Sequence, residues 1–213
     1  MATTLTNTEA ALQQVQVAVL AKAPVPGLAK TRLIPALGAK GAARLQRQLT
    51  RSALRCALTA GLGPVTLWCA PDPQHRFFRA LQKTTVVRCQ AQPEGDLGAR
   101  MLAAFEGHCP QGPLLLIGTD CAVLQPSHLR AAAQALLAGA DAVCYPAQDG
   151  GYVLIGLRQP QPGLFEDMTW STSSVMLDTR VRANALGLQL RELETLWDVD
   201  VPADLTRLRA LPA

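Results

Sequence analysis

The chain has 213 residues, of which 49% are hydrophobic and 17% charged, and its formal net charge is +4. This length suits a single domain, and this composition supports a packed core rather than a disordered chain. The small, dispersed positive charge and the 4% of aromatic residues do not predict a nucleic-acid-binding surface. Apolar runs such as "PLLLIG" are far shorter than a membrane span, and the N-terminal residues lack the pattern of a secretory signal. We therefore expect a cytoplasmic protein.

In chain order, a flexible leader at residues 1–14 is followed by apolar runs of strand length that alternate with segments of helical periodicity. The expected elements are a strand at 15–22, a helix at 41–61, a strand at 64–71, a helix at 74–82, a strand at 84–92, a helix at 96–108, a strand at 113–120, a helix at 127–139, strands at 140–147 and 151–157, a helix at 171–187, a strand at 188–193 and a helix at 202–211. This alternation predicts βαβ units, a mostly parallel central sheet, and one domain at 15–213.

Ligands of such sheets bind beyond the carboxyl ends of the strands. The loops after residue 22, after residue 120 and around residue 149 follow strand ends in this prediction, and they carry the unusual residues. Several familiar chemistries are excluded. No G-x-G-x-x-G follows the first strand, "PVPGLAKT" lacks two glycines of the P-loop pattern, and G-x-S-x-G is absent. The six cysteines form no CxxC pair, which favours buried reduced thiols over a zinc site or disulfides.

The stretch "AKAPVPGLAKTRLIP" at 21–35 concentrates positive charge on a loop stiffened by proline. Its cations are Lys22, Lys30 and Arg32. Lysine is a compact cation for phosphate oxygens, and the planar guanidinium of arginine suits bidentate contact. Pro26 restricts the loop and Gly27 permits close backbone approach, so the segment predicts a phosphate-binding loop. The alternative is a solvated connection whose lysines have no function.

Carboxylates close two predicted strand ends. Asp120 ends the buried run "LLLIGTD", and Asp198 and Asp200 alternate about a valine, so both face one side of an extended segment. Magnesium prefers oxygen ligands and offsets the repulsion of such a cluster. The alternatives are that Asp120 caps a turn and that Asp200 caps the last helix, whose first turn also holds Asp204.

Two glycine-containing turns are weaker candidates. In "QDGGYVLIGL", Asp149 precedes Gly150 and Gly151, which allow a ligand to approach the backbone. A plain β-turn uses the same residues. In "EGDLGARM" at 94–101, the acidic residue would bond a ribose or base, or else cap the helix that follows.

Five motifs occur in an order that resembles a known transferase family. They are "LAKAPVPGLAKTRL", "GTDCAVL", "DGGYVLIGL", "MTWSTSSV" and "WDVDVPADL", and together they span about residues 15 to 208. The family is associated with radical-SAM and selenoprotein-domain operons, is commonly labelled glycosyltransferase, and includes members tied to arsenosugar biosynthesis. The first and last motifs are also similar to 2-phospho-L-lactate guanylyltransferase, in the same nucleotide-diphospho-sugar transferase (GT-A-like) superfamily.

The resemblance implies a three-layer α/β/α Rossmann-like GT-A fold and a role for each motif. The implied phosphate- and nucleotide-binding residues are Lys22, Pro26, Gly27, Lys30, Arg32, Gly95, Asp96 and Gly98. The implied metal ligands are Asp120, Asp198 and Asp200, and the implied acceptor-binding residues are Asp149, Gly150, Gly151, Tyr152 and Trp170. The chain departs from the family pattern at Ala122, where many relatives have proline, and it lacks the L-x-G-G-x-G of sugar-phosphate nucleotidyltransferases.

The expected function is therefore transfer from a nucleotide-activated donor, dependent on Mg²⁺ (or Mn²⁺), to a small-molecule acceptor. Glycosyl transfer is the first expectation, with Lys30 and Arg32 stabilising the leaving phosphates and Asp149 orienting or deprotonating the acceptor hydroxyl. The alternatives are nucleotidyl transfer, in which a phosphorylated small acid attacks a nucleoside triphosphate and releases pyrophosphate, and a nucleotide-binding module without catalysis.

Overall fold

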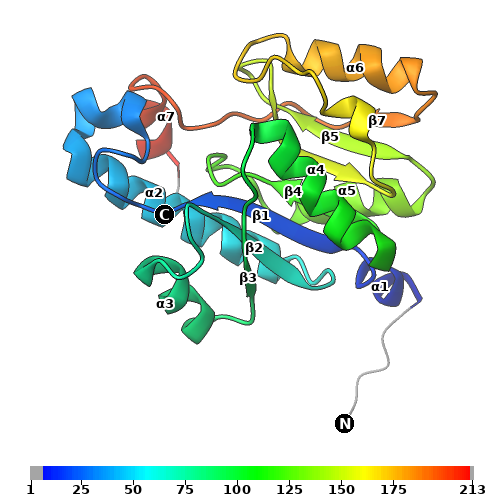
Figure 1. Ribbon diagram of the computed structural model, residues 1–213, viewed down its shortest axis with the longest axis horizontal. Helices are drawn as coiled ribbons and strands as arrows, with labels where there is room; N and C mark the ends of the chain where they lie inside the picture. Colours follow the sequence, from blue (N-terminus) through cyan, green and yellow to red (C-terminus); the bar gives the residue numbers. More distant parts are fainter. Residues whose placement is uncertain (1–6, 212–213) are drawn as a thin grey trace.

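The structure is a computed structural model that describes residues 7–211, and it is built around a seven-stranded sheet (Figure 1). The strands are β1 (Gln16–Lys22), β2 (Val65–Ala70), β3 (Arg88–Ala91), β4 (Leu114–Ile117), β5 (Ala142–Pro146), β6 (Tyr152–Leu157) and β7 (Leu190–Glu192). Their order across the sheet is β3-β2-β1-β4-β6-β5-β7. The pairs that involve β6 are antiparallel and the others are parallel. The prediction of a mostly parallel sheet is confirmed.

Helices cover both faces of the sheet and make three layers (Figure 1). The α-helices are α1 (Asn7–Leu12), α2 (Ile34–Thr59), α3 (Arg76–Thr84), α4 (Leu97–His108), α5 (Pro126–Leu137), α6 (Val175–Ala185) and α7 (Asp204–Arg209). Three 3-10 helices join them, η1 (Thr31–Leu33), η2 (Cys109–Gln111) and η3 (Pro162–Leu164). The buried side chains of α2, α3 and α5 pack on one face of the sheet, and those of α4 and α6 pack on the other.

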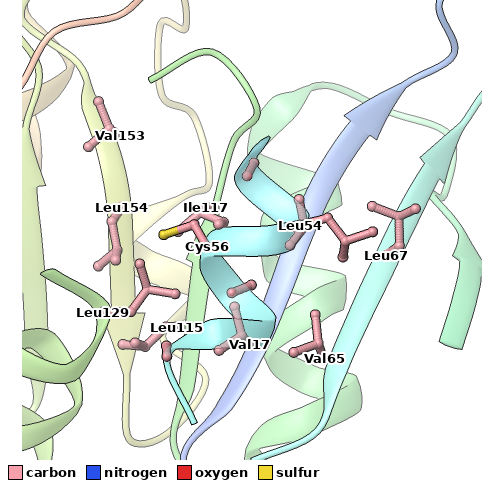
Figure 2. Close-up of a cluster of buried hydrophobic side chains, with 14 of the residues drawn as sticks. Val17, Leu54, Cys56, Val65, Leu67, Leu115, Ile117, Leu129, Val153 and Leu154 are labelled. Atoms are coloured by element: carbon pink, nitrogen blue, oxygen red, sulfur yellow. The ribbon is translucent and has the colours of Figure 1, made fainter. Parts of the chain in front are cut away.

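The alternation of strand side chains assigns residues to the two faces. On β1, Val17 and Val19 belong to the core under α2 and α5, whereas Ala18 belongs to the core under α4. Figure 2 shows the first core, in which Leu54 and Cys56 of α2 lie over the side chains of β1, β2 and β4. Since both faces are buried, the central strands read as continuous apolar runs.

The structure corrects the boundaries of several predicted elements. The strand expected at 84–92 is the shorter β3, and the helix expected at 171–187 begins at Val175. Residues 7–12 form α1, whose Leu12 is buried, although this stretch belonged to the expected flexible leader; residues 1–6 lie outside the described part. The helix expected at 41–61 begins at Ile34, with non-helical backbone at Gly38. The last helix is shorter than expected, and its Leu205 packs with Leu33 near the start of α2. This packing brings the C-terminal segment to the first loop.

The six cysteines are free thiols, as their spacing predicted. Cys56, Cys69, Cys109 and Cys144 are buried, and burial raises the pKa of Cys109 to about 11. Such thiols act as small apolar side chains of the core rather than as nucleophiles.

Candidate active site

A cavity of about 690 Å³ opens at the carboxyl ends of β1 and β4. The first residues of β6 lie at this same edge because β6 runs antiparallel to β4, with Leu154 opposite Ile117. The loop after β1, the residues after β4, the turn before β6 and the segment at 198–200 all contribute to its lining. The edge of the sheet on which the sequence analysis placed the site is therefore the edge that is hollowed.

Lys30 joins the first loop to two of the predicted metal carboxylates. Its Nζ lies 2.8 Å from Asp120 Oδ2 and 2.9 Å from Asp200 Oδ1, and it donates to the carbonyl oxygen of Val199 at 2.7 Å. Its side chain is only 4% exposed. Burial alone would lower the pKa of Lys30, but Asp120 and Asp200 outweigh burial and the pKa is raised. The ammonium group is therefore charged, and each of its three protons has an acceptor.

The loop that carries Lys30 is a compact turn. The amides of Leu28 and Ala29 both donate to the carbonyl of Val25, and Ala29 is fully buried. Lys30 has left-handed backbone dihedrals, φ 48° and ψ 49°, at the residue before η1. A left-handed lysine costs about 1–2 kcal/mol, and the three contacts of its ammonium group oppose that cost.

Asp120 is held from a second side. Its Oδ1 accepts from Thr119 Oγ1 at 3.1 Å, and Thr119 Oγ1 accepts from Gln46 Nε2 at 3.1 Å. Gln46 and Thr119 are both buried. The backbone carbonyl of Asp120 also accepts from the amide of Val199, which ties the end of β4 to the segment at 198–200.

Asp198 is the most perturbed carboxyl group of the site. Its pKa is raised to about 7, first by burial and then by the carboxylates of Asp120, Asp149 and Asp200, while Lys30 acts in the opposite direction. Asp198 and Asp200 both line the cavity, as their spacing predicted. Asp204, not Asp200, holds the turn before α7, because its Oδ2 accepts from the amides of Asp200 and Val201.

The predicted phosphate-binding residues divide into two groups. Lys22 is exposed at the end of β1, and Arg32 has a side chain that is 66% exposed, with Nη1 3.6 Å from Asp200 Oδ2; both line the cavity. Pro26 and Gly27 do not line it. They belong to the turn that positions Lys30, in which Gly27 has φ 84°.

The start of α4 meets the cavity with different residues from those predicted. Asp96 caps the helix by accepting from the amide of Ala99 at 2.8 Å, so its place favours the capping alternative. Gly98 packs against Trp170, and neither it nor Gly95 lines the cavity. The lining residues here are instead Leu97, Arg100 and Met101.

The predicted acceptor residues belong to the turn before β6, to the first residue of that strand and to the segment that begins at Trp170. Asp149, Gly151, Tyr152 and Trp170 line it, whereas Gly150 lies beneath the backbone of Ser173. Asp149 Oδ1 accepts from the amide of Gly151 at 3.0 Å. Burial raises the pKa of Tyr152 well above its ordinary value, so its hydroxyl is neutral.

Several lining residues escaped the sequence analysis. Gln92 follows β3 and anchors its Nε2 on the carbonyls of Trp68 and Ala21, at 2.8 Å and 3.3 Å. Ser171, Thr172 and Ser173 follow Trp170 and line the cavity with hydroxyl groups. The hydroxyl-rich run "STSS" could have pointed to Ser171, Thr172 and Ser173, whereas nothing in the sequence around Gln92 indicated a site residue.

The donor atoms of the cluster suit a hard divalent cation. Four carboxylates, those of Asp120, Asp149, Asp198 and Asp200, face two cations, Lys30 and Arg32, so the cluster is acidic when all are ionised. Oxygen ligands of this charge fit Mg²⁺ or Mn²⁺. Within residues 7–211 no group of three or more acidic, histidine or cysteine side chains is spaced as a ready-made metal site, and Lys30 lies between two of the predicted ligands.

Comparison with known proteins places the chain in a family. Residues 53–172 match the family described as "Uncharacterized protein conserved in bacteria (DUF2064)". The chain belongs to this family. The part that matches DUF2064 contains Asp120, Asp149 and Trp170, whereas Lys30 and Asp198 lie outside it. No curated protein matches the sequence.

Solved structures share the fold over nearly the whole chain. A protein from Desulfovibrio desulfuricans G20, provisionally named a nucleotide-diphospho-sugar transferase, is 26% identical, with a TM-score of 0.85 over 93% of this chain and 87% of its own. A nucleotidyl transferase from Methanothermobacter thermautotroptrophicus is 17% identical, with a TM-score of 0.62 over 92% and 95%. The 4-diphosphocytidyl-2C-methyl-D-erythritol synthase from Anaerococcus prevotii is 11% identical, with a TM-score of 0.58 over 94% and 97%.

The Desulfovibrio and Methanothermobacter proteins are transferases by name, in agreement with the expected enzyme class. They confirm the nucleotide-diphospho-sugar transferase fold that the resemblance implied. The finer association of this DUF2064 chain with radical-SAM operons and arsenosugars stays a prediction. In the described part of the chain, no helix, not even the 26-residue α2, combines the length and apolar character that a membrane crossing requires.

Proposed function

We propose that this protein is a transferase that uses a nucleotide-activated donor, requires a divalent cation, and transfers a glycosyl group to a small hydroxylated acceptor. The observation that carries the proposal is the convergence of the cationic loop and four carboxylates on one cavity at the ligand-binding edge of the sheet. The similarity to the Desulfovibrio protein supports the donor class. The volume of the cavity suits a ligand of nucleotide-sugar size.

Lys22 and Arg32 are two cations that can meet the donor phosphates. Both line the cavity and are exposed, and Arg32 is only loosely paired with Asp200. An arginine fork near developing negative charge stabilises a leaving diphosphate. At the β2–β3 side, Gln92 holds its amide nitrogen on two carbonyls, so its Oε1 is the atom available to accept a hydrogen bond from the base or ribose.

Asp120, Asp198 and Asp200 would hold the divalent cation. A cation held there would supply positive charge that offsets the negative charge developing on the leaving group. The protein keeps the carboxylate of Asp120 in place through Gln46 and Thr119. It joins the segment at 198–200 to the end of β4 through the amide of Val199, which donates to the backbone carbonyl of Asp120.

The acceptor end favours glycosyl over nucleotidyl transfer. A sugar hydroxyl needs a base, and Asp149 lines the cavity beside the hydroxyl-rich segment at 171–173 and the ring of Trp170. Carboxylate, hydroxyl and aromatic groups are suited to a neutral polyhydroxylated molecule. Nucleotidyl transfer to a phosphorylated acid remains the second candidate, and the nucleotidyl transferases among the structural neighbours favour it.

A thermal-unfolding screen of nucleotides and nucleotide-sugars, with and without Mg²⁺, tests the proposal. A specific donor at 100 times its dissociation constant should stabilise the fold by about 2.7 kcal/mol, and only with the cation. Release of a nucleoside diphosphate from that donor with an acceptor supports glycosyl transfer. Release of pyrophosphate from a nucleoside triphosphate would show nucleotidyl transfer instead of glycosyl transfer. Binding of a nucleotide without turnover would identify a non-catalytic module.

Replacing Arg32 by Gln should lower kcat/KM for the donor by about 10²-fold, because the charge that faces the leaving phosphates is lost. The melting temperature should stay within a degree or two, because the side chain is exposed. Arg44→Gln, an exposed change on α2 outside the cavity, is the control and should leave kcat/KM unchanged. If the Arg32 variant and the control had equal kcat/KM values, Arg32 would have no role in donor binding or catalysis.

A further inference from the structure

The ammonium group of Lys30 lies where the predicted metal ligands converge. It contacts one oxygen each of Asp120, Asp200 and Val199 at 2.7–2.9 Å. These oxygens come from two parts of the chain, the end of β4 and the segment that precedes α7. A backbone hydrogen bond from the amide of Val199 to the carbonyl of Asp120 also joins these two parts. Lys30 thus supplies the positive charge about which these two parts of the chain meet.

An ammonium group and a divalent cation compete for the same oxygens. Mg²⁺ binds oxygen at about 2.0–2.1 Å and tolerates little distortion of its octahedral shell. Asp120 Oδ2 and Asp200 Oδ1 cannot serve as ligands at that distance while both also accept from Lys30 Nζ, because the two cations would repel each other at close range.

The cavity offers space into which the Lys30 side chain can move. Lys30 lines the cavity, so a turn of its side chain away from the carboxylates would carry the ammonium group toward the ligand space. The lysine side chain has a flexible four-carbon stem, and its charge is retained during such a movement. The same displacement would bring it to the donor phosphates, which is the role that the family resemblance implied.

We propose that Lys30 is the resident counter-ion of the Asp120–Asp198–Asp200 cluster, and that a divalent cation replaces its ammonium group there and releases it toward the donor phosphates. This inference rests on the proposed function, which supplies the cation. Two consequences follow. Lys30 weakens metal binding to the protein without donor, and it holds the carboxylates together until donor and metal arrive.

The test compares Mn²⁺ affinity in the absence of nucleotide, by titration with electron paramagnetic resonance of free Mn²⁺. Lys30→Met should bind Mn²⁺ at least about tenfold more tightly than the wild type, because a positive charge near a divalent ion is removed. Lys30→Arg keeps the charge and should stay near the wild type. Lys83→Met, an exposed lysine on α3 outside the cavity, makes the same change of net charge and should have no effect.

A second measurement uses the wild type and does not depend on the folding of a variant. Reductive methylation followed by mass spectrometry should leave Lys30 protected without metal and should label it several-fold faster with Mn²⁺ bound. Lys22, which is exposed, is the internal reference.

The outcomes separate the two proposals. If the wild type binds Mn²⁺ and Lys30→Met binds it no more tightly, or if bound Mn²⁺ leaves Lys30 protected, the counter-ion role is overturned and the proposed function stands. If neither protein binds Mn²⁺ with or without a nucleotide donor, both proposals are overturned.

Discussion

Asp198→Asn is expected to lose at least about 10²-fold in activity and yet to be more stable than the wild type at pH 8. The loss follows from the proposed role of this carboxylate in binding the divalent cation. The gain follows from its surroundings, because burial and three neighbouring carboxylates disfavour its charge and raise its pKa to about 7. Asparagine has nearly the same shape and no charge to bury.

The sign of the pH dependence is set by the two pKa values of Asp198. In the unfolded chain the group ionises near 3.8, and in the folded protein near 7. Between these values the folded state keeps a proton that the unfolded state has released, so the contribution of this group to stability falls as pH rises from about 4 to about 7. At pH 4 the wild type and Asp198→Asn should have similar free energies of unfolding.

Each pKa unit corresponds to about 1.4 kcal/mol, so a gain of about 2 kcal/mol or more is expected at pH 8. Urea denaturation at pH 4 and pH 8 measures it. Glu106→Gln, which neutralises an exposed carboxylate outside the cavity, is the control and should show no such pH-dependent gain. A loss of stability at pH 8 in the Asp198 variant would show that its carboxylate is favourably paired, contrary to the geometry.

Gly150→Ala is expected to lower the free energy of unfolding by about 3 kcal/mol or more. Gly150 has φ 92°, and a Cβ atom at this position would overlap the carbonyl oxygen of Ser173. That neighbour is backbone and cannot turn away. The turn that carries Asp149 would have to separate from the segment at 170–176, to which it is tied by the hydrogen bond from the amide of Met176 to the carbonyl of Gly150.

Gly27→Ala is the matched control for this substitution. Gly27 has a similar φ of 84°, but nothing lies within 4 Å of the Cβ that alanine would add. It should therefore show only the cost of the left-handed backbone, about 1 kcal/mol. Urea denaturation of both variants separates the cost of backbone strain from the cost of the steric overlap. Equal losses in the free energy of unfolding would mean that the overlap with Ser173 does not add to the cost of Gly150→Ala.

Much of the site followed from strand ends. Asp120 was expected at the edge of the sheet because it closes a buried apolar run, and a parallel sheet gathers such ends on one side. Asp198 and Asp200 were expected to share a side because extended residues alternate. Both expectations depend on local pattern and on a general rule of sheet topology, so a single sequence contains them.

Other features had no local signal. The contact of Lys30 with Asp120 and Asp200 depends on residues separated by 90 and 170 positions. The pairing of β1 with β4 brings Asp120 to the first loop, and the packing of the C-terminal segment near the start of α2 brings Asp200 there. The burial of Gly98 against Trp170 removed it from the cavity for the same reason. Gln46, which supports Asp120 through Thr119, reads in the sequence as an ordinary helical residue.

The sequence by itself therefore determined the alternation of strands and helices, the edge of the sheet at which the cavity lies, and the residue types available there. The tertiary structure decided which of those residues face the cavity and which are paired with one another, above all that the lysine of the first loop is bound by carboxylates. The physical reason is the separation along the chain over which each property is set. Periodicity and strand ends are properties of neighbouring residues, whereas charge pairing and burial depend on distances between remote parts of the chain that only folding sets.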